Sequence, residues 1–430
     1  MSDNAVSTPR FDGPTGSKVS IVVVSASAGA GHDAAARAWA ERLESAGFAV
    51  LYRDFLDALP RRIGHRMSRD YLGVLARCPW LYGVLFRLCT RRAVAAIITR
   101  LLLGRLRRRV GRMIDPGAVA VLSTYPLASQ VLGQLRASGQ LQVPVVTFLT
   151  DFSVHHLWVS TQVDQHLALH ETTAAAARRL GAREVRVTGP VVPHRFVADG
   201  LLDRRQARVA IGLPAEGCLA LLVGGSWGVG EIEAAAGDIA ATGVVTPVVL
   251  CGHNDRLRQR LQARGVGLVL GWISDMPTLL RAVDVVVENA GGMTSLEAMA
   301  TGVPVLTYRA IPGHGRANAR ALHTAGVSSW ARDKESLARQ LSALTKDALG
   351  EQQRARARAV FARDPLAELE QALRDPADRL VDRLGDDGGA GHGGPGLRLR
   401  WRRLGVAAGA AAALLLGHSF MMATLAELLR

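Results

Sequence analysis

The clearest fold signal in this chain is VDVVVENAGGMTSLEAMATGVPVLTY, residues 283–308. The letters indicate, in order, a buried strand at 285–287, a turn at 289–292, a helix from Thr294 to about Gly302, and an apolar strand at 304–308. Such a parallel βαβ unit points the helix N-terminus, with its unpaired N–H groups, at a ligand above the strand ends. Gly291 and Gly292 would let that ligand approach the backbone, and Glu297 could accept hydrogen bonds from a ribose.

A plain helix cap explains part of the same stretch. Thr294 and Glu297 stand three residues apart and form a T-x-x-E capping box, which needs no ligand. Taken alone, the stretch therefore leaves a nucleotide site and a simple cap both open.

The composition indicates two domains and an uneven distribution of charge. A chain of 430 residues is too long for one core. The net charge of +15 is carried almost wholly by arginine, since the only lysines are Lys18, Lys334 and Lys346. Fourteen arginines stand against one acid, Asp70, between residues 61 and 112, so much of the excess lies in one segment.

The cysteines and the N-terminus favour a protein of the cytoplasm. Neither a C-x-x-C pair nor zinc spacing occurs among the four cysteines, and no secretory signal begins the chain; the cysteines are Cys78, Cys89, Cys218 and Cys251. We therefore expect reduced thiols and no structural metal. We expect no nucleic-acid partner either, because no recognition motif accompanies the charge.

Two glycine-rich loops divide the alternating strands and helices into halves. One loop, 26–32, follows a β-branched run at 19–25, and the other, 224–230, follows an apolar run at 219–223. Polar residues at the carboxyl ends of parallel strands line the ligand crevice of such sheets. Asp151 follows another apolar strand and is therefore a candidate site residue.

These patterns predict five segments along the chain. They are a disordered tail at 1–17, an N-terminal Rossmann-like domain at 18–190, a C-terminal Rossmann-like domain at 191–374, a linker at 375–400 and an apolar helix at 401–430. The apolar centre of the last segment is too short to span a bilayer alone. A weak transmembrane anchor and an interfacial helix both remain open for it.

His32 is an unusual residue for the N-terminus of the first helix, which we expect from Asp33 to Ala46. The helix dipole disfavours an imidazolium there and suits a neutral base. A histidine that merely caps the loop would explain the same position.

The basic segment 61–112 has the character of a membrane-contacting surface. Aromatic and aliphatic side chains interleave with its arginines, and no apolar run approaches the ~20 residues of a transmembrane helix. Basic amphipathic helices with Trp and Leu on one face lie on anionic membrane surfaces. The predicted contacts are Arg61, Arg62, Tyr71, Trp80, Arg87, Arg91, Arg92, Arg105, Arg107, Arg108 and Arg109. The alternative is an ordinary insertion whose apolar face packs on the core.

An ordered set of motifs resembles a known family. The motifs are Gly29-x-Gly31-His32, Thr150-Asp151 with His155 and Trp158, Thr188-Gly189-Pro190, Gly224-Gly225, Cys251-Gly252, Gly271-Trp272 with Met276-Pro277, Gly291-Gly292-x-Thr294-x-x-Glu297, and Pro312-Gly313 with Asn318. In this order they resemble the monogalactosyldiacylglycerol synthases and the processive diacylglycerol β-glucosyltransferases, relatives of the lipid II N-acetylglucosaminyltransferase. The resemblance covers roughly residues 19–345. It implies an α/β fold of the GT-B type, with two Rossmann-like domains facing a central cleft and, here, a C-terminal apolar tail.

The resemblance also implies an activity. It is the inverting, metal-independent transfer of galactose or glucose from a UDP-sugar to diacylglycerol or a related lipid, without a cofactor, at the cytoplasmic face of the cell membrane. His32 would be the general base, and Asp151 would orient it or substitute for it. Gly29 and Gly31 would form the acceptor or phosphate loop. The implied UDP-sugar residues are Gly224, Gly225, Ser226, Gly252, Trp272, Gly291, Gly292, Thr294, Glu297, His314 and Asn318.

Two departures from the family pattern concern the donor. The Gln and Glu that usually follow Pro-Gly are replaced by His314 and Gly315 here. Where many members have a Lys before the Gly-Gly motif, this chain has Asn289 and Ala290. The identity of the sugar therefore stays open. A UDP-sugar epimerase on the same scaffold is a second possibility, disfavoured by the arginine segment. An inactive UDP-sugar-binding paralogue is a third, motivated by His314 and Gly315.

Overall fold

The computed structural model describes most of the two expected domains. The described residues are 19–27, 30–59, 79–102, 106–197 and 202–374. The expected N-terminal tail, the linker and the apolar C-terminal helix lie outside them. Among the helices it describes, none is both long and apolar enough to cross a bilayer.

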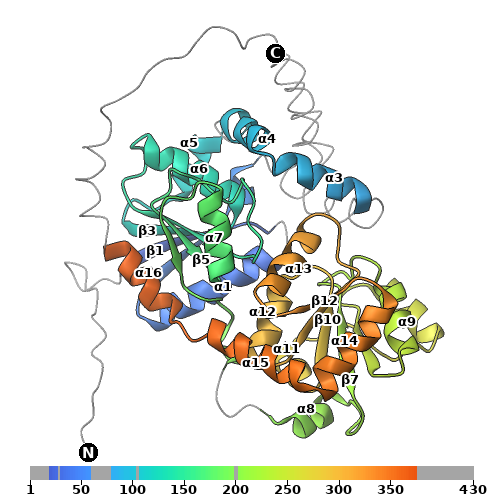
Figure 1. The fold of residues 1–430 in the computed structure, drawn as a ribbon. Coiled ribbons are helices and arrows are strands. Elements are labelled where there is room, and N and C mark those ends of the chain that lie inside the picture. Colours follow the sequence, from blue (N-terminus) through green and yellow to red (C-terminus); the bar gives the residue numbers. More distant parts are fainter. Residues whose placement is uncertain (1–18, 28–29, 60–78, 103–105, 198–201, 375–430) are drawn as a thin grey trace, which may run out of the picture.

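The N-terminal domain is built on a parallel sheet (Figure 1). Its described strands run in the order β2-β1-β3-β4-β5-β6. The strands are β1 (Ser20–Ser25), β2 (Ala49–Asp54), β3 (Ala118–Ser123), β4 (Val145–Leu149), β5 (Gln165–Ala168) and β6 (Val185–Val187). The helices are α1 (Ala30–Ser45), α3 (Pro79–Cys89), α4 (Arg92–Ile97), α5 (Arg107–Met113), α6 (Pro126–Ala137) and α7 (Glu171–Arg179), with short turns η1 (Phe55–Ala58), η2 (Ile98–Leu102) and η4 (His194–Phe196).

Both faces of this sheet are covered, which explains why its central strands are continuous apolar runs. Val23 of β1 packs in the same core as Trp39 of α1. Its neighbour Val24 belongs to the opposite core, with Val131 of α6. Buried on both faces, the strands hold the residues at their carboxyl ends in fixed positions.

The C-terminal domain repeats the arrangement, with described strands in the order β12-β11-β10-β7-β8-β9. The strands are β7 (Leu219–Val223), β8 (Thr246–Leu250), β9 (Leu268–Leu270), β10 (Val285–Glu288), β11 (Val305–Tyr308) and β12 (Ser329–Ala331). The helices are α8 (Arg204–Ile211), α9 (Ile232–Ala241), α10 (Asp255–Ala263), α11 (Met276–Arg281), α12 (Met293–Ala300), α13 (His314–Thr324), α14 (Lys334–Lys346), α15 (Ala348–Val360) and α16 (Pro365–Arg374). All described strand pairs in both sheets are parallel, as the expected Rossmann-like halves require.

The predicted capping box at the start of α12 is wrong. The helix begins at Met293 with Gly292 as its N-cap, and no side chain caps it. Thr294 therefore lies inside the first turn rather than at the N-cap, and its side chain caps none of the unpaired N–H groups there. Glu297 lies a further turn along and is free for another role.

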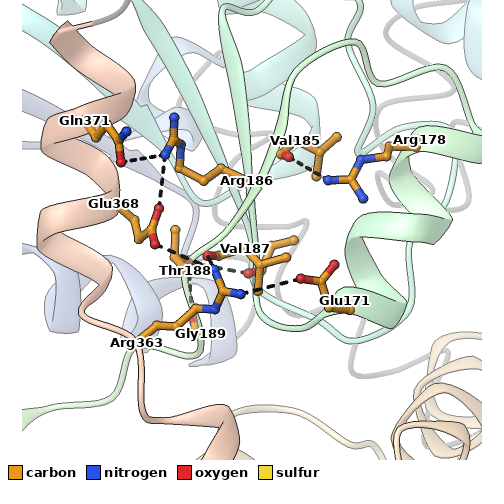
Figure 2. A network of polar contacts seen from close by, with 11 residues as sticks. Glu171, Arg178, Val185, Arg186, Val187, Thr188, Gly189, Arg363, Glu368 and Gln371 are labelled. Atoms are coloured by element: carbon orange, nitrogen blue, oxygen red, sulfur yellow. Dashed lines mark hydrogen bonds and ion pairs between the residues drawn. The ribbon is translucent and has the colours of Figure 1, made fainter.

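The last helix returns to the N-terminal domain. Arg186 of β6 donates hydrogen bonds to Glu368 at 3.3 Å and to Gln371 at 2.8 Å (Figure 2). The sequence places residues 365–374 in the second domain, but these polar contacts of α16 are with the first. The chain thus crosses between the domains twice, once after β6 and once before α16.

The two crossings contact one another. Arg363 donates to the carbonyl oxygen of Val187 at 3.2 Å (Figure 2). Gly189 has a φ of +81°, and a Cβ on it would lie 2.8 Å from the carbonyl oxygen of Val360. Only glycine suits both the left-handed backbone and this close approach.

Candidate active site between the two domains

His32 lies where three strands of the first sheet end. Its Nδ1 is 2.9 Å from the carbonyl oxygen of Thr124, after β3, and 3.2 Å from the hydroxyl of Thr150, after β4. A carbonyl oxygen can only accept, so Nδ1 carries a proton in this contact. In the neutral ring Nε2 then has a free lone pair, which is the form that a general base needs. Trp158 packs 5.6 Å from the ring and limits its rotation.

Two buried histidine rings lie near the carboxylate of Asp151, and a third lies near those two rings. Burial lowers the pKa of His32, whereas the nearby Asp151 carboxylate opposes that shift. His314, from the other domain, has its pKa lowered by burial and is affected by the same Asp151. Burial lowers the pKa of His155 to about 3. Near pH 7 the structure therefore favours uncharged rings of His32 and His314 near Asp151, with an uncharged His155 near these two rings.

Asn318 of α13 joins the two domains beside this carboxylate. Its Nδ2 donates to Asp151 at 3.1 Å and to the carbonyl oxygen of Ala290 at 3.1 Å. Its Oδ1 accepts from the backbone N–H of Ser153 at 3.0 Å and from the Ser153 hydroxyl at 2.6 Å. The predicted donor residue Asn318 is fully occupied by the protein, and it aligns the two halves of the cleft.

The first glycine loop of the C-terminal domain brings four predicted donor residues together. Gly224 and Gly225 follow β7, and a Cβ on Gly252 would lie 2.3 Å from the carbonyl oxygen of Ser226. Gly230 shows a similar constraint, because a Cβ there would lie 2.6 Å from Nδ2 of Asn289. These two glycines are needed for close internal packing, whereas a Cβ on Gly225 would meet nothing within 4 Å. The backbone at Gly225 is therefore open to a ligand such as a diphosphate.

Trp272 forms an exposed aromatic shelf next to this loop. It is 55% exposed, and His253 stacks on it at 4.1 Å with an interplanar angle of 13°. The backbone N–H of His253 donates to Ser226 at 2.9 Å, which attaches the shelf to the glycine loop. A flat base can stack on such a surface.

The turn before α12 is held by a residue that sequence reasoning missed. The buried carboxylate of Glu288 accepts hydrogen bonds from the backbone N–H groups of Ala290 and Gly291 and from Thr307. Its position could have been noticed, because a single acid ends the apolar run of β10. This contact fixes Gly291 and Gly292 at the carboxyl edge of the sheet.

The first turn of α12 faces the first turn of α1. A Cβ on Gly31 would lie 4.0 Å from Cγ of Met293. Thr294, half-buried, lies in that turn of α12. Glu297 is further along, and burial raises its pKa to about 7 while Arg195 acts in the opposite direction.

Part of the predicted membrane surface is described. Trp80 of α3 is 65% exposed, and Arg87, Arg91, Arg92, Arg108 and Arg109 are exposed while Arg107 is half-buried. Gly29, Arg61, Arg62, Tyr71 and Arg105 lie outside the described residues.

A pocket of about 280 Å³ lies between α3 and the loop after β4. Its lining includes Phe86 of α3, Thr90 just after that helix, His155 and His156 of the loop, and Ala317 of α13. Nδ1 of His155 is buried there without a hydrogen-bond partner among the described residues. No group of His, Cys, Asp and Glu side chains suited to a metal ion occurs in the part of the chain that the structure describes.

Each of the two domains contains a region that matches a known protein family. Residues 32–192 match the monogalactosyldiacylglycerol (MGDG) synthase family, and residues 230–360 match the glycosyl transferases group 1 family. The chain carries an MGDG synthase domain and a group 1 glycosyl transferase domain. The resemblance drawn from the ordered motifs is confirmed, and His32 is the first residue of the MGDG synthase match.

Curated relatives carry matching names. A processive diacylglycerol beta-glucosyltransferase of Bacillus cytotoxicus is 25% identical over 233 residues, which is 53% of this chain and 60% of the relative. One of Bacillus cereus is 25% identical over 279 residues, 61% of this chain and 66% of the relative. The match therefore spans under two thirds of these relatives' length.

Solved structures share the two-domain fold. UGT71G1 of Medicago truncatula, complexed with UDP-glucose, aligns with 83% of this chain and 98% of its own at a TM-score of 0.52 and 13% identity. UGT2 of Phytolacca americana, complexed with UDP-2fluoro-glucose and pterostilbene, aligns with 83% of this chain and 99% of its own at a TM-score of 0.52 and 11% identity. At such low identity the likeness establishes the fold alone. The GT-B fold that the MGDG synthase resemblance implied is thereby confirmed.

Proposed function

We propose that the chain is an inverting glycosyltransferase that moves a hexose from a UDP-sugar to the hydroxyl of diacylglycerol or a related lipid. The observation that carries the proposal is the cleft itself. It brings His32 and Asp151 of the MGDG synthase domain against Asn318 of the glycosyl transferase domain. The names of the Bacillus relatives support the lipid acceptor and the hexose.

His32 would act as the general base. With Nδ1 engaged by the carbonyl of Thr124, Nε2 takes the proton from the acceptor hydroxyl. The acceptor oxygen attacks C1 of the sugar from the face opposite UDP, and the bond from C1 to the diphosphate oxygen breaks. Asp151 stabilises the imidazolium that forms, since its charge favours the protonated ring.

The leaving diphosphate would be held by backbone groups. In the loop after β7 a ligand can approach the backbone at Gly225, where a Cβ would meet nothing within 4 Å. Helix α12 begins with Gly292 as its N-cap, and no side chain caps it. Unpaired N–H groups at a helix N-terminus stabilise developing negative charge without a metal ion. In this arrangement Trp272 would stack on the uracil and Glu297 would accept from the ribose.

The acceptor would arrive along α3. The pocket beside Phe86 and His155 lies next to the loop that carries Asp151, and the exposed Trp80 and arginines share its helix or the next one. Such a surface fits an anionic membrane at the cytoplasmic face. The protein would then bind the membrane peripherally and take its acceptor from it.

A donor and acceptor screen tests the proposal. The full chain is incubated with diacylglycerol in anionic liposomes and radiolabelled UDP-glucose, UDP-galactose or UDP-N-acetylglucosamine, and the lipids are separated by thin-layer chromatography. We expect a labelled glycolipid from one of the two hexose donors. Label released into sugar without a glycolipid, conversion of one UDP-sugar into another, or UDP binding with no turnover would each contradict the proposal.

A further inference from the structure

Helix α3 of the N-terminal domain reaches into the donor half of the cleft. Tyr82 is buried and packs in one apolar cluster with Ile311, and Val229 and Ala290 border that cluster. These three partners come from the glycine loop after β7, the turn after β10 and the loop after β11. A side chain of the acceptor domain thus meets the loops that would surround the donor.

Helix α3 packs closely against the loop after β11 because each of them has a glycine at the contact. A Cβ on Gly83 would lie 2.8 Å from Cβ of Pro312. Gly313, with a φ of +84°, would bring its own Cβ within 3.0 Å of Phe86 and 3.2 Å of Tyr82. A larger residue at either glycine would push the helix away from the loop, so the contact depends on this pair.

The contact ends in a hydrogen bond to a ring of the reaction centre. The Tyr82 hydroxyl lies 2.9 Å from Nδ1 of His314, and the two rings meet edge to face at 5.6 Å. His314 is uncharged near pH 7, because burial lowers its pKa. A Tyr82 hydroxyl that donates to Nδ1 leaves the proton of the neutral ring on Nε2.

The position of His314 matches that of the transferred sugar. The anomeric carbon must bond to the diphosphate at the glycine loops and also lie within reach of an acceptor held by His32. His314 lies close to both points: the charges of Asp151 and His32 act on its pKa. A Cβ on the next residue, Gly315, would lie 2.7 Å from the carbonyl oxygen of Asn289, in the turn before α12. A ring N–H at this place can donate to a hexose hydroxyl.

We propose that Tyr82 is a positioning residue for the donor sugar, which holds the ring of His314 so that its Nε2–H meets the hexose. The proposal rests on the proposed function for the identity of the ligand. It adds that a helix of the acceptor domain completes the donor-sugar site.

Calorimetric titrations without acceptor test this inference. UDP, UDP-glucose and UDP-galactose are titrated into the wild type, Tyr82→Phe, His314→Ala and the double variant. We expect Tyr82→Phe to weaken the preferred UDP-sugar roughly three- to tenfold, as one hydrogen bond does, and to leave UDP unchanged. The double variant should be no weaker than His314→Ala, because Tyr82 acts through that ring.

Two glycine variants provide an independent test. Gly83→Ala should reproduce the selective loss for the UDP-sugar, because its Cβ displaces α3 from Pro312. Gly111→Ala, in α5, is the matched control, since its Cβ would meet Leu135 at an ordinary 3.7 Å. Its affinities should equal those of the wild type.

Equal weakening of UDP and UDP-sugar in Tyr82→Phe, additive losses in the double variant, or no change in Gly83→Ala would overturn the proposal. The outcome is separate from the transfer reaction. If the variants differ from the wild type in UDP-sugar binding as expected, but the wild type makes no glycolipid, only the proposed function is contradicted. A wild type that binds none of the three nucleotides would overturn both.

Discussion

The two ring nitrogens of His32 have separate tasks. Nδ1 is held by the carbonyl of Thr124, and Nε2 is left for chemistry. Because burial lowers the pKa of the ring, it stays neutral at a pH where a free histidine is protonated. Asp151 acts in the opposite direction and keeps that pKa from falling further.

This balance predicts a shift in the pH profile. In Asp151→Asn the pKa of His32 should fall further, so the acid limb of kcat/KM moves to lower pH than in the wild type. The plateau should also fall, by roughly tenfold to a thousandfold, because the imidazolium loses its counter-charge. Initial rates of glycolipid formation between pH 4.5 and 8 measure both effects.

His32→Ala is the reference for this series. It should abolish transfer while UDP affinity stays near that of the wild type. An acid limb that moves upward in Asp151→Asn would show that the carboxylate does not act on His32.

Helix α12 carries an acid at a cost to stability. Burial raises the pKa of Glu297 to about 7, above its ordinary 4.5. Above pH 7 the folded protein must hold the ionised form that burial disfavours, and the penalty disappears as the pH falls through 7 toward 4.5. We expect Glu297→Gln to be more stable than the wild type at pH 8, by at most roughly 3 kcal/mol, and equal to it near pH 4.5.

The same substitution should weaken UDP, because an amide is a poorer acceptor for ribose hydroxyls than a carboxylate. Thermal unfolding at pH 8 and pH 4.5, together with UDP titrations at pH 8, measures both changes. A variant that gains stability with unchanged UDP affinity would remove Glu297 from the nucleotide site.

Local sequence patterns predicted most of the helices and strands, but not the short β12 or the start of α12. Strands such as β4 were predicted because a buried parallel strand is a continuous apolar run. The short β12 was missed, since its sequence SWA has no such run. The predicted capping box was wrong because the helix begins at Met293, one residue before the predicted start at Thr294, with Gly292 as its N-cap.

The candidate site shows the same limit. His32 and Asp151 were predicted from the helix start and the strand end on which they stand. The partners of His314 and Asn318 were not, because Tyr82 and Ser153 are 232 and 165 residues away along the chain. Only the folded arrangement of two domains makes these pairs neighbours.

The described basic surface makes a prediction for the whole molecule. Arg91 and Arg92 are exposed next to α3. Arg91→Glu with Arg92→Glu should reduce binding to anionic vesicles by at least thirtyfold, at about 1 kcal/mol for each arginine near the surface. Co-sedimentation at low and high salt measures the loss, which salt should diminish.

A variant of equal charge change serves as the control. Arg205 and Arg256 are exposed in the C-terminal domain, so Arg205→Glu with Arg256→Glu should keep most of the vesicle binding. Equal losses in the two double variants would mean that net charge, and not the surface around α3, governs membrane binding.

The contact between the two interdomain crossings sets how the cleft can open. Gly189 touches Val360, and Arg363 binds Val187, so both connecting segments pass through one place. Two bodies whose covalent connections pass through one place can rotate about it as a hinge, and displacement grows with distance from the pivot. Figure 1 shows α16, beside the pivot, and α3 on opposite sides of the N-terminal domain. The hydrogen bond between Tyr82 and His314 therefore lies far from the pivot, where a small rotation about it separates the two domains most.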